Sequence, residues 1–126
     1  MAIQESGQMY LETILILTNK SQSVRAIDIG EEMNFSKPSV SRAIHLLEKQ
    51  GMVSIDGQGF ITLTDPGREI AESIYSRHQV LSKFFMSIGV DEDVAVNDAC
   101  RVEHYISEET FSALKRYIEK NEAGRN

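Results

Sequence analysis

The chain has 126 residues, of which 41% are hydrophobic, and carries a formal net charge of −6. This composition supports a buried core, while the acidic balance argues against non-specific coating of nucleic acid, which needs Lys and Arg against phosphates. No apolar run of about 18 residues occurs, so we expect no membrane-spanning helix. Met1 to Gln8 lack the basic and apolar blocks of a secretion signal, so we expect a cytoplasmic protein.

The first segment predicts three helices. One runs from Ser6 to about Asn19, and Ser23 can cap a short second helix with Ile27 as its clearest core residue. Ser36 caps the third, with Pro38 in its first turn, where a missing N–H is tolerated.

The third helix has a clear buried stripe. Val40, Ile44 and Leu47 recur at i, i+4 and i+7, which is the spacing of one helical face. Gly51 is placed to end this helix, because glycine tolerates the left-handed conformation common at helix C-termini.

Two short β-rich segments follow, Met52–Ile55 and Phe60–Thr64. Asp56-Gly57-Gln58-Gly59 between them provides turn residues, so the pair predicts a hairpin. A hairpin directly after a helix-turn-helix is typical of a winged helix.

From Asp65 onward the sequence predicts only helices. Asp65 caps a long helix, with Pro66 at its first position, that stops near Gly89. Asp91 and Ser107 can cap two more helices.

The fold class is therefore mainly α. We expect residues 1–64 to form a winged helix-turn-helix with a two-stranded wing and residues 65–126 to form an α-helical dimerisation domain.

The outward positions at the start of the third helix are polar or basic: Lys37, Pro38, Ser39, Ser41 and Arg42. Ser and Arg suit phosphate oxygens and guanine edges, and a proline ring can pack against a thymine methyl group. A helical hairpin with a solvated face explains these residues equally well. The added wing favours DNA binding.

Several residues have side chains that bind metal ions. Cys100, Glu103 and His104 have the spacing i, i+3, i+4, which on a helix places them on one face. Met9 and Glu12 are three apart on the first helix, and His78 stands alone on the long one. Spacing alone leaves the ordinary roles open, namely core Met, solvated Glu, buried Cys and packed His.

Five segments together resemble a known family: Met9–Ile14, Ser36–Ser41, Leu63–Gly67, Arg77–His78 and Asn97–His104. The chain is similar to the iron- and manganese-dependent repressors, which include diphtheria toxin repressor and the manganese transport regulator. The resemblance implies a homodimer that binds a near-palindromic DNA operator, with a metal site between the first helix and the dimerisation domain. We expect no enzymatic activity.

By position, the resemblance implies ligands from two branches of the family. Met9, Cys100, Glu103 and His104 match the DNA-activating site of the iron-responsive branch. Glu12 and His78 match ligands of the paired-metal site in the manganese-responsive branch, so the chain looks like a hybrid. A thioether and a thiolate favour Fe²⁺, Co²⁺, Ni²⁺ or Zn²⁺ over the harder Mn²⁺. We predict Fe²⁺ first and Mn²⁺ second.

Two other functions remain open. A winged-helix regulator that responds to an organic ligand or to thiol oxidation would be indifferent to chelators. A small metalloenzyme could use Glu103 as a general base, but it would need an open coordination position and a substrate cleft. That alternative leaves the third helix and the wing without a role.

Overall fold

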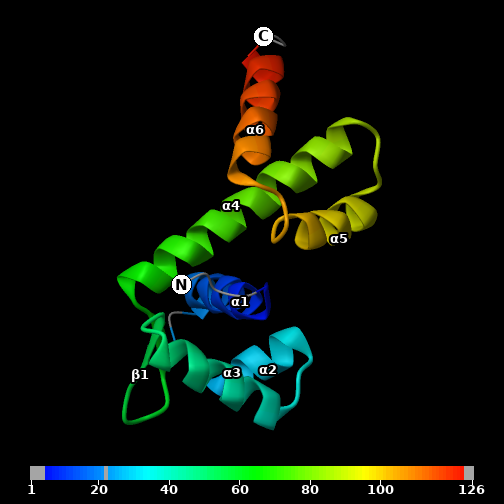
Figure 1. Cartoon of the computed structure of the whole chain (residues 1–126). Coiled ribbons are helices and arrows are strands. Elements are labelled where there is room, and N and C mark those ends of the chain that lie inside the picture. The colour runs from blue at the N-terminus through cyan, green and yellow to red at the C-terminus, as the bar shows by residue number, and fades with distance from the viewer. Residues whose placement is uncertain (1–4, 22, 124–126) are drawn as a thin grey trace. The chain divides into compact units, whose positions relative to one another are not determined.

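The structure is a computed structural model that describes residues 5–21 and 23–123. Met1 to Gln4, part of the segment considered for a secretion signal, lie outside the described residues. The described chain is mainly helical, as expected, with one two-stranded antiparallel sheet (Figure 1). Its elements are α1 (Glu5–Ser21), α2 (Ala26–Met33), α3 (Lys37–Lys49), β1 (Val53–Ile55), β2 (Ile61–Leu63), α4 (Asp65–Ser87), α5 (Glu92–Val102) and α6 (Glu108–Ala123).

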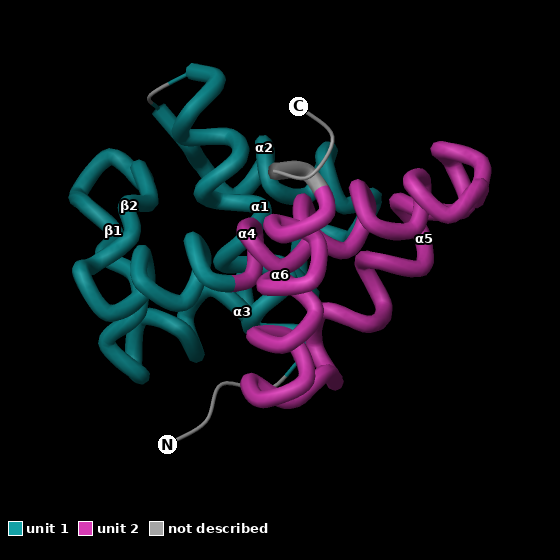
Figure 2. The backbone as a smooth tube through the Cα atoms, turned by 90° about the horizontal axis from the view of Figure 1, so that it is seen from above, with its two compact units in different colours: residues 1–73 teal, residues 74–126 magenta. Residues whose placement is uncertain are grey.

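The chain divides into two compact units, residues 1–73 and 74–126 (Figure 2). The division falls inside α4, so unit 1 contains the first turns of this helix and unit 2 contains the rest. Among the described residues, no helix has both the length and the apolar composition needed to cross a bilayer.

The core of unit 1 is built by apolar side chains from three helices and the hairpin. Its buried members include Leu11, Ile14, Ile29, Val40, Ile44, Leu47, Val53 and Ile61. The stripe on α3 is confirmed, because Val40, Ile44 and Leu47 are all buried.

The core prediction for α2 was wrong. Ile27 is 67% exposed, whereas Ile29 is fully buried. Residues two apart lie on nearly opposite sides of a helix, so only one of these isoleucines can face the core. The predicted cap was also wrong: Arg25 occupies the N-cap position, and its N–H donates to the Asp28 carboxylate at 2.9 Å.

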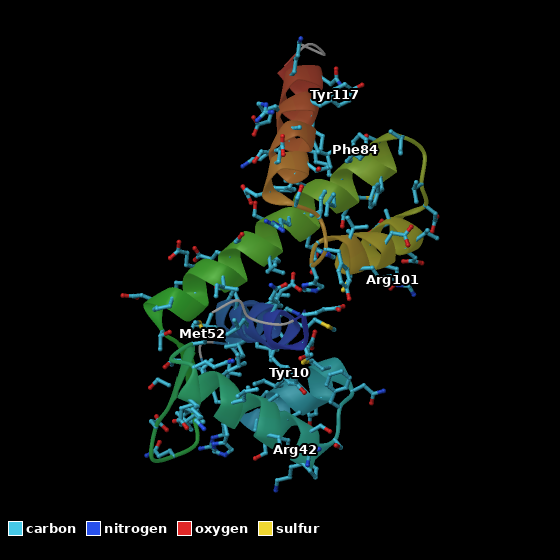
Figure 3. All side chains as sticks on the ribbon, viewed as in Figure 1. Tyr10, Arg42, Met52, Phe84, Arg101 and Tyr117 are labelled. Atoms are coloured by element: carbon cyan, nitrogen blue, oxygen red, sulfur yellow. The ribbon has the colours of Figure 1, made fainter. Side chains whose placement is uncertain are left out.

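Tyr10 of α1 lies between α1 and the following two helices (Figure 3). Its ring packs against Phe35 with 6.0 Å between ring centroids. Burial raises the pKa of Tyr10, and the Arg42 guanidinium opposes that change only in part. Tyr10 therefore acts as a neutral packing residue at neutral pH.

The hairpin forms where it was predicted, with slightly shorter strands. Val53 pairs with Leu63, and Ile55 pairs with Ile61. The Asp56 side chain organises the turn, since its Oδ1 accepts hydrogen bonds from the main-chain N–H groups of Gln58 and Phe60, both at 2.9 Å. The turn also uses a glycine at positive φ, Gly59.

The turn end of the hairpin is bonded to the segment between α1 and α2. The Ile61 N–H donates to the Val24 carbonyl at 2.7 Å. The Arg25 guanidinium lies 4.3 Å from the Phe60 ring centroid, within the range of a cation–π contact. These contacts fix the wing to the helical part of unit 1.

Thr64 connects the end of the hairpin to both neighbouring helices. Its hydroxyl donates to the Gly51 carbonyl at 2.7 Å and accepts from the Gly67 N–H at 3.2 Å, while its own N–H donates to the Met52 carbonyl. Thr64 is thus the cap of α4, in place of the predicted Asp65, which is the first residue of the helix.

Unit 2 contains most of α4 together with α5 and α6. Its core includes Ile74, Leu81, Ala95, Ala99 and Phe111. The predicted caps of α5 and α6 are confirmed: Asp91 accepts from the Asp93 N–H and Ser107 accepts from the Thr110 N–H.

The fifth helix is shorter than predicted. Glu103 caps α5 and still donates its N–H to the Ala99 carbonyl, but His104 lies in the turn that follows. Cys100, Glu103 and His104 therefore do not share one helical face. The turn, rather than helical periodicity, sets the direction of the His104 side chain.

Candidate metal centre and nucleic-acid interface

The predicted metal ligands are divided between the two units. Met9 and Glu12 are both on α1 in unit 1, where Met9 is half-buried and Glu12 is 9% exposed. The other four lie in unit 2: His78 on α4, Cys100 on α5, Glu103 at the α5 cap and His104 in the next turn.

Within unit 2 the structure brings two imidazoles to one carboxylate. His78 Nδ1 and Glu103 Oε2 form a hydrogen bond of 2.9 Å. The other carboxylate oxygen, Glu103 Oε1, lies 3.5 Å from His104 Nε2. Segments separated by more than twenty residues in sequence are thus joined at a single acidic group.

This carboxylate is fully buried. The Glu103 side chain has no solvent exposure, and that of His104 is 1% exposed. Within the described part of the chain, Glu103 Oε1 has no hydrogen bond. A buried carboxylate oxygen without a hydrogen bond is costly unless a nearby positive charge compensates it.

The donor set fits a divalent transition-metal ion. Imidazole nitrogens and a carboxylate oxygen are common ligands of Fe²⁺, Mn²⁺ and Zn²⁺, and a cation would supply the missing compensation at Glu103. Cys100 adds a half-buried thiol near the end of the same helix. Such a cluster can bind a divalent cation, whose charge compensates the Glu103 carboxylate.

One residue beside this cluster was quoted from the sequence only as part of the family resemblance and was given no role of its own. Arg77, next to His78 on α4, donates to the carbonyl oxygens of Glu103 and Ile106 and to the carboxylate of Glu108. The sequence signal was its place in the Arg77–His78 segment, directly before a candidate ligand. Its acceptors are mostly main-chain atoms, which sequence patterns do not reveal.

The predicted DNA-binding residues lie at the start of α3. Lys37, Pro38 and Arg42 are exposed, and Arg42 projects from the side of α3 that faces away from α1 (Figure 3). Ser39 and Ser41 are half-buried. The Ser36 hydroxyl donates to Ser39 Oγ at 2.9 Å, so Ser39 takes part in capping the helix.

The exposed side of α3 extends further than the predicted set. His45 and Lys49 are exposed three and seven residues after Arg42, which places all three on one side of the helix. His45 Nδ1 lies 3.7 Å from Glu48 Oε1. The i, i+7 spacing of Arg42 and Lys49 was the signal that would have extended the set to Lys49.

Comparison with known proteins identifies both halves of the chain. Residues 2–59 match the N-terminal DNA-binding domain of the iron dependent repressors, and residues 64–123 match the metal-binding and dimerisation domain of the same proteins. The chain belongs to the iron-dependent repressor family. The exposed side of α3 lies in the DNA-binding match, and the carboxylate–imidazole cluster lies in the metal-binding match.

Individual relatives agree with this assignment. The transcriptional regulator MntR of Escherichia coli O6:H1 is 29% identical over 114 residues, covering 90% of this chain and 74% of the relative. The uncharacterized HTH-type transcriptional regulator MJ0568 of Methanocaldococcus jannaschii is 29% identical over 120 residues, covering 94% and 96%.

Solved structures show the same fold. A manganese-dependent transcriptional repressor in complex with manganese aligns with a TM-score of 0.82 at 29% identity, covering 90% of this chain and 52% of that one. The manganese regulator SloR aligns with a TM-score of 0.80 at 26% identity, covering 94% and 55%. The chain therefore spans about half the length of these two solved chains.

The family assignment settles the class of function. The chain is a metal-dependent, DNA-binding transcriptional regulator and not an enzyme, so the metalloenzyme alternative is set aside. A DNA-binding domain joined to a dimerisation domain implies binding to DNA by associated copies of the chain.

Proposed function

We propose that this chain is a repressor activated by Fe²⁺, with Mn²⁺ as the second candidate, that controls genes of metal homeostasis. The observation that carries the proposal is the buried Glu103 carboxylate between His78 and His104, in the part of the chain that matches the family's metal-binding domain. A divalent cation at this cluster would compensate the buried carboxylate.

The choice of metal rests on the remaining ligands. Cys100, three residues before Glu103, is proposed to supply a soft sulfur donor, and Met9 and Glu12 are proposed as further ligands from their positional match to the family. Soft sulfur donors favour Fe²⁺ or Zn²⁺ over Mn²⁺, and the supply of each metal in the cell then selects among them. The manganese named for two of the solved relatives keeps Mn²⁺ as the second candidate.

Binding of a cation requires particular protonation states of the chain's own groups. Glu103 must be ionised, both imidazoles must be neutral at the ligating nitrogen, and Cys100 must be a thiolate. A bound divalent ion supplies positive charge that offsets the carboxylate and the thiolate. Metal affinity should therefore fall as the solution is acidified.

The link from metal to DNA follows from where the proposed ligands sit in the chain. Met9 and Glu12 are on the first helix of the DNA-binding part, so joint ligation with the unit 2 residues restrains that part. The two α3 helices of a homodimer then meet successive major grooves of a near-palindromic operator. Metal and operator each tighten binding of the other by the same factor.

A set of exposed apolar side chains in unit 2 supports self-association: Met86, Ile88, Val94 and Val96. Large apolar side chains that are exposed in a single copy of a chain are often buried when copies associate. Met86 and Ile88 lie at the end of α4 and in the following turn, whereas Val94 and Val96 are two apart on α5 and so lie on nearly opposite sides of it. We assign Met86 and Ile88 to the homodimer contact.

The test is a titration of labelled DNA from the chain's own upstream region, under anaerobic conditions. We expect no specific binding in chelator, restoration by Fe²⁺, and loss of that restoration in Cys100→Ala and His104→Ala. Asp98→Asn is the matched control, because it removes an exposed charge from α5 outside the ligand set. Equal operator occupancy in demetallated buffer would refute metal dependence, and activation by Mn²⁺ at lower concentrations than Fe²⁺ would reverse the ranking.

A further inference from the structure

The Arg77 guanidinium donates three hydrogen bonds around the turn that follows α5. Its Nη1 donates to the carbonyl oxygens of Glu103 and Ile106, at 3.3 Å and 3.1 Å. Its Nη2 donates to Glu108 Oε2 at 2.8 Å. The guanidinium also lies 5.4 Å from the Phe111 ring centroid, and the side chain is only 16% exposed.

These acceptors bracket the turn that carries two candidate ligands. The carbonyl groups at the end of a helix have no partner within it, and a cation beside them is favourable. Glu103 is the C-cap residue of α5, and Ile106 directly precedes Ser107, the N-cap residue of α6. Arg77 therefore holds the turn from both ends.

Arg77 and His78 both bond to Glu103, through different atoms of that residue. Arg77 holds the main-chain carbonyl of Glu103, while His78 holds its carboxylate through the 2.9 Å hydrogen bond. Two adjacent residues of one helix thus fix both the position and the direction of the Glu103 side chain. A single hydrogen bond to the carboxylate would leave the backbone of the turn unrestrained.

The contact with Glu108 contributes less than the contacts with the carbonyls. The Glu108 side chain is 76% exposed, and exposed ion pairs contribute little because solvent screens them. The carbonyl contacts are shielded, because the Arg77 side chain is mostly buried. The positioning effect should therefore depend mainly on the two main-chain acceptors.

We propose that Arg77 is a positioning residue for the metal site, which presets Glu103 and His104 before a cation arrives. This inference rests on the proposed function, because it assumes that these two residues bind metal. Residues that orient metal ligands without touching the metal typically affect its affinity by about 10- to 100-fold. Arg77→Gln should produce a loss of this size without a change in stoichiometry.

The experiment uses Co²⁺ alone as the probe, with the full chain and no DNA. Affinity and the visible absorption spectrum are measured for wild type, Arg77→Gln, Arg77→Lys, Glu108→Gln and Arg116→Gln. We expect Arg77→Gln to bind at least ~10-fold more weakly with an altered spectrum. Arg77→Lys should recover part of the affinity, because an ammonium can donate to carbonyl oxygens but lacks the planar fork of the guanidinium.

Two of these variants are matched controls. Glu108→Gln removes the exposed ion pair and keeps both carbonyl contacts, so its affinity should stay within about threefold of wild type. Arg116→Gln removes an exposed positive charge from α6 and should leave affinity and spectrum unchanged. A loss in Arg116→Gln equal to that in Arg77→Gln would indicate a general effect of charge and overturn the inference.

The outcomes separate this inference from the proposed function. If wild type fails to bind Co²⁺, or if Glu103→Gln binds as wild type does, the proposed function itself fails. If wild type binds and both Arg77 variants keep its affinity and spectrum, the inference alone fails. Should Arg77→Gln not fold in the absence of metal, as judged by circular dichroism, Arg77→Lys decides: weakened binding supports the inference, and wild-type binding overturns it.

Discussion

His78 Nδ1 lies 2.9 Å from Glu103 Oε2, so a histidine on α4 and the residue that caps α5 share one buried hydrogen bond. In the metal-free protein this bond holds the carboxylate in place. It does not remove the cost of burying the carboxylate, because the other oxygen has no hydrogen bond within the described residues.

Replacing this carboxylate with an amide should separate stability from metal binding. We expect Glu103→Gln to weaken metal binding by at least ~100-fold, more than the loss of a residue that only orients a ligand. In chelator, its melting temperature should equal or exceed that of wild type, because a neutral amide costs less to bury. Calorimetry with and without chelator measures both. A large drop in the chelated melting temperature would show that Glu103 is chiefly a stabilising residue.

Arg42 should carry a substantial part of DNA binding. Arg42→Ala removes an exposed cation from the side of α3 that points away from the core, so operator affinity should fall by about 1–3 kcal/mol if Arg42 contacts a base. If it contacts a phosphate, the slope of log K against log salt should decrease in magnitude by about 1. Fluorescence anisotropy at several salt concentrations distinguishes these cases. Arg116→Gln is the control, and an unchanged affinity and slope in Arg42→Ala would contradict the assignment of α3 as the recognition helix.

Gly67 tests the close approach of α4 to the hairpin. A Cβ at this position would overlap the carbonyl of Met52, and backbone atoms cannot rotate away. Gly67→Ala should therefore reduce the free energy of unfolding by about 1–3 kcal/mol, although alanine in a helix is otherwise favoured over glycine by about 1 kcal/mol. Urea denaturation measures the change. Gly57→Ala, where an added Cβ meets no atom within 4 Å, should be close to neutral.

The pKa of Tyr10 predicts a stability change in alkaline solution. Burial raises this pKa above the ordinary value of 10.0, so folding favours the neutral phenol. The contribution of Tyr10 to stability is fully present below pH 10. It is lost as the pH rises through the raised pKa, because the phenol ionises at lower pH in the unfolded chain. Comparing wild type with Tyr10→Phe from pH 8 to 11.5 isolates this contribution, since the other tyrosines are common to both. Parallel stability curves for the two proteins would argue against it.

Much of the fold could be predicted because its patterns are local. The stripe on α3, the glycine turn of the hairpin and the caps at Asp91 and Ser107 each depend on residues close in sequence. The wrong core residue of α2 arose because a short segment offered two equivalent choices. Ile27 and Ile29 are equally apolar, and an eight-residue helix is too short for its periodicity to decide between them.

The site was predictable in composition and not in arrangement. Residue types and family resemblance indicated His78, Glu103 and His104, but no spacing predicts that one carboxylate lies between two imidazoles. That arrangement depends on the turn after α5, where helical spacing no longer applies. It also depends on Arg77, whose hydrogen bonds to the main-chain carbonyls of Glu103 and Ile106 cannot be inferred from the sequence.

A single hydroxyl group has a wider consequence for how a repressor of this kind can switch. The Thr64 hydroxyl bonds to Gly51, two residues after α3, and to Gly67 in the first turn of α4, and the Thr64 N–H bonds to Met52, just before β1. A rotation of the start of α4 should therefore move α3 and the hairpin together. Variation in those first turns offers evolution a way to adjust operator affinity without altering a group that touches DNA or metal.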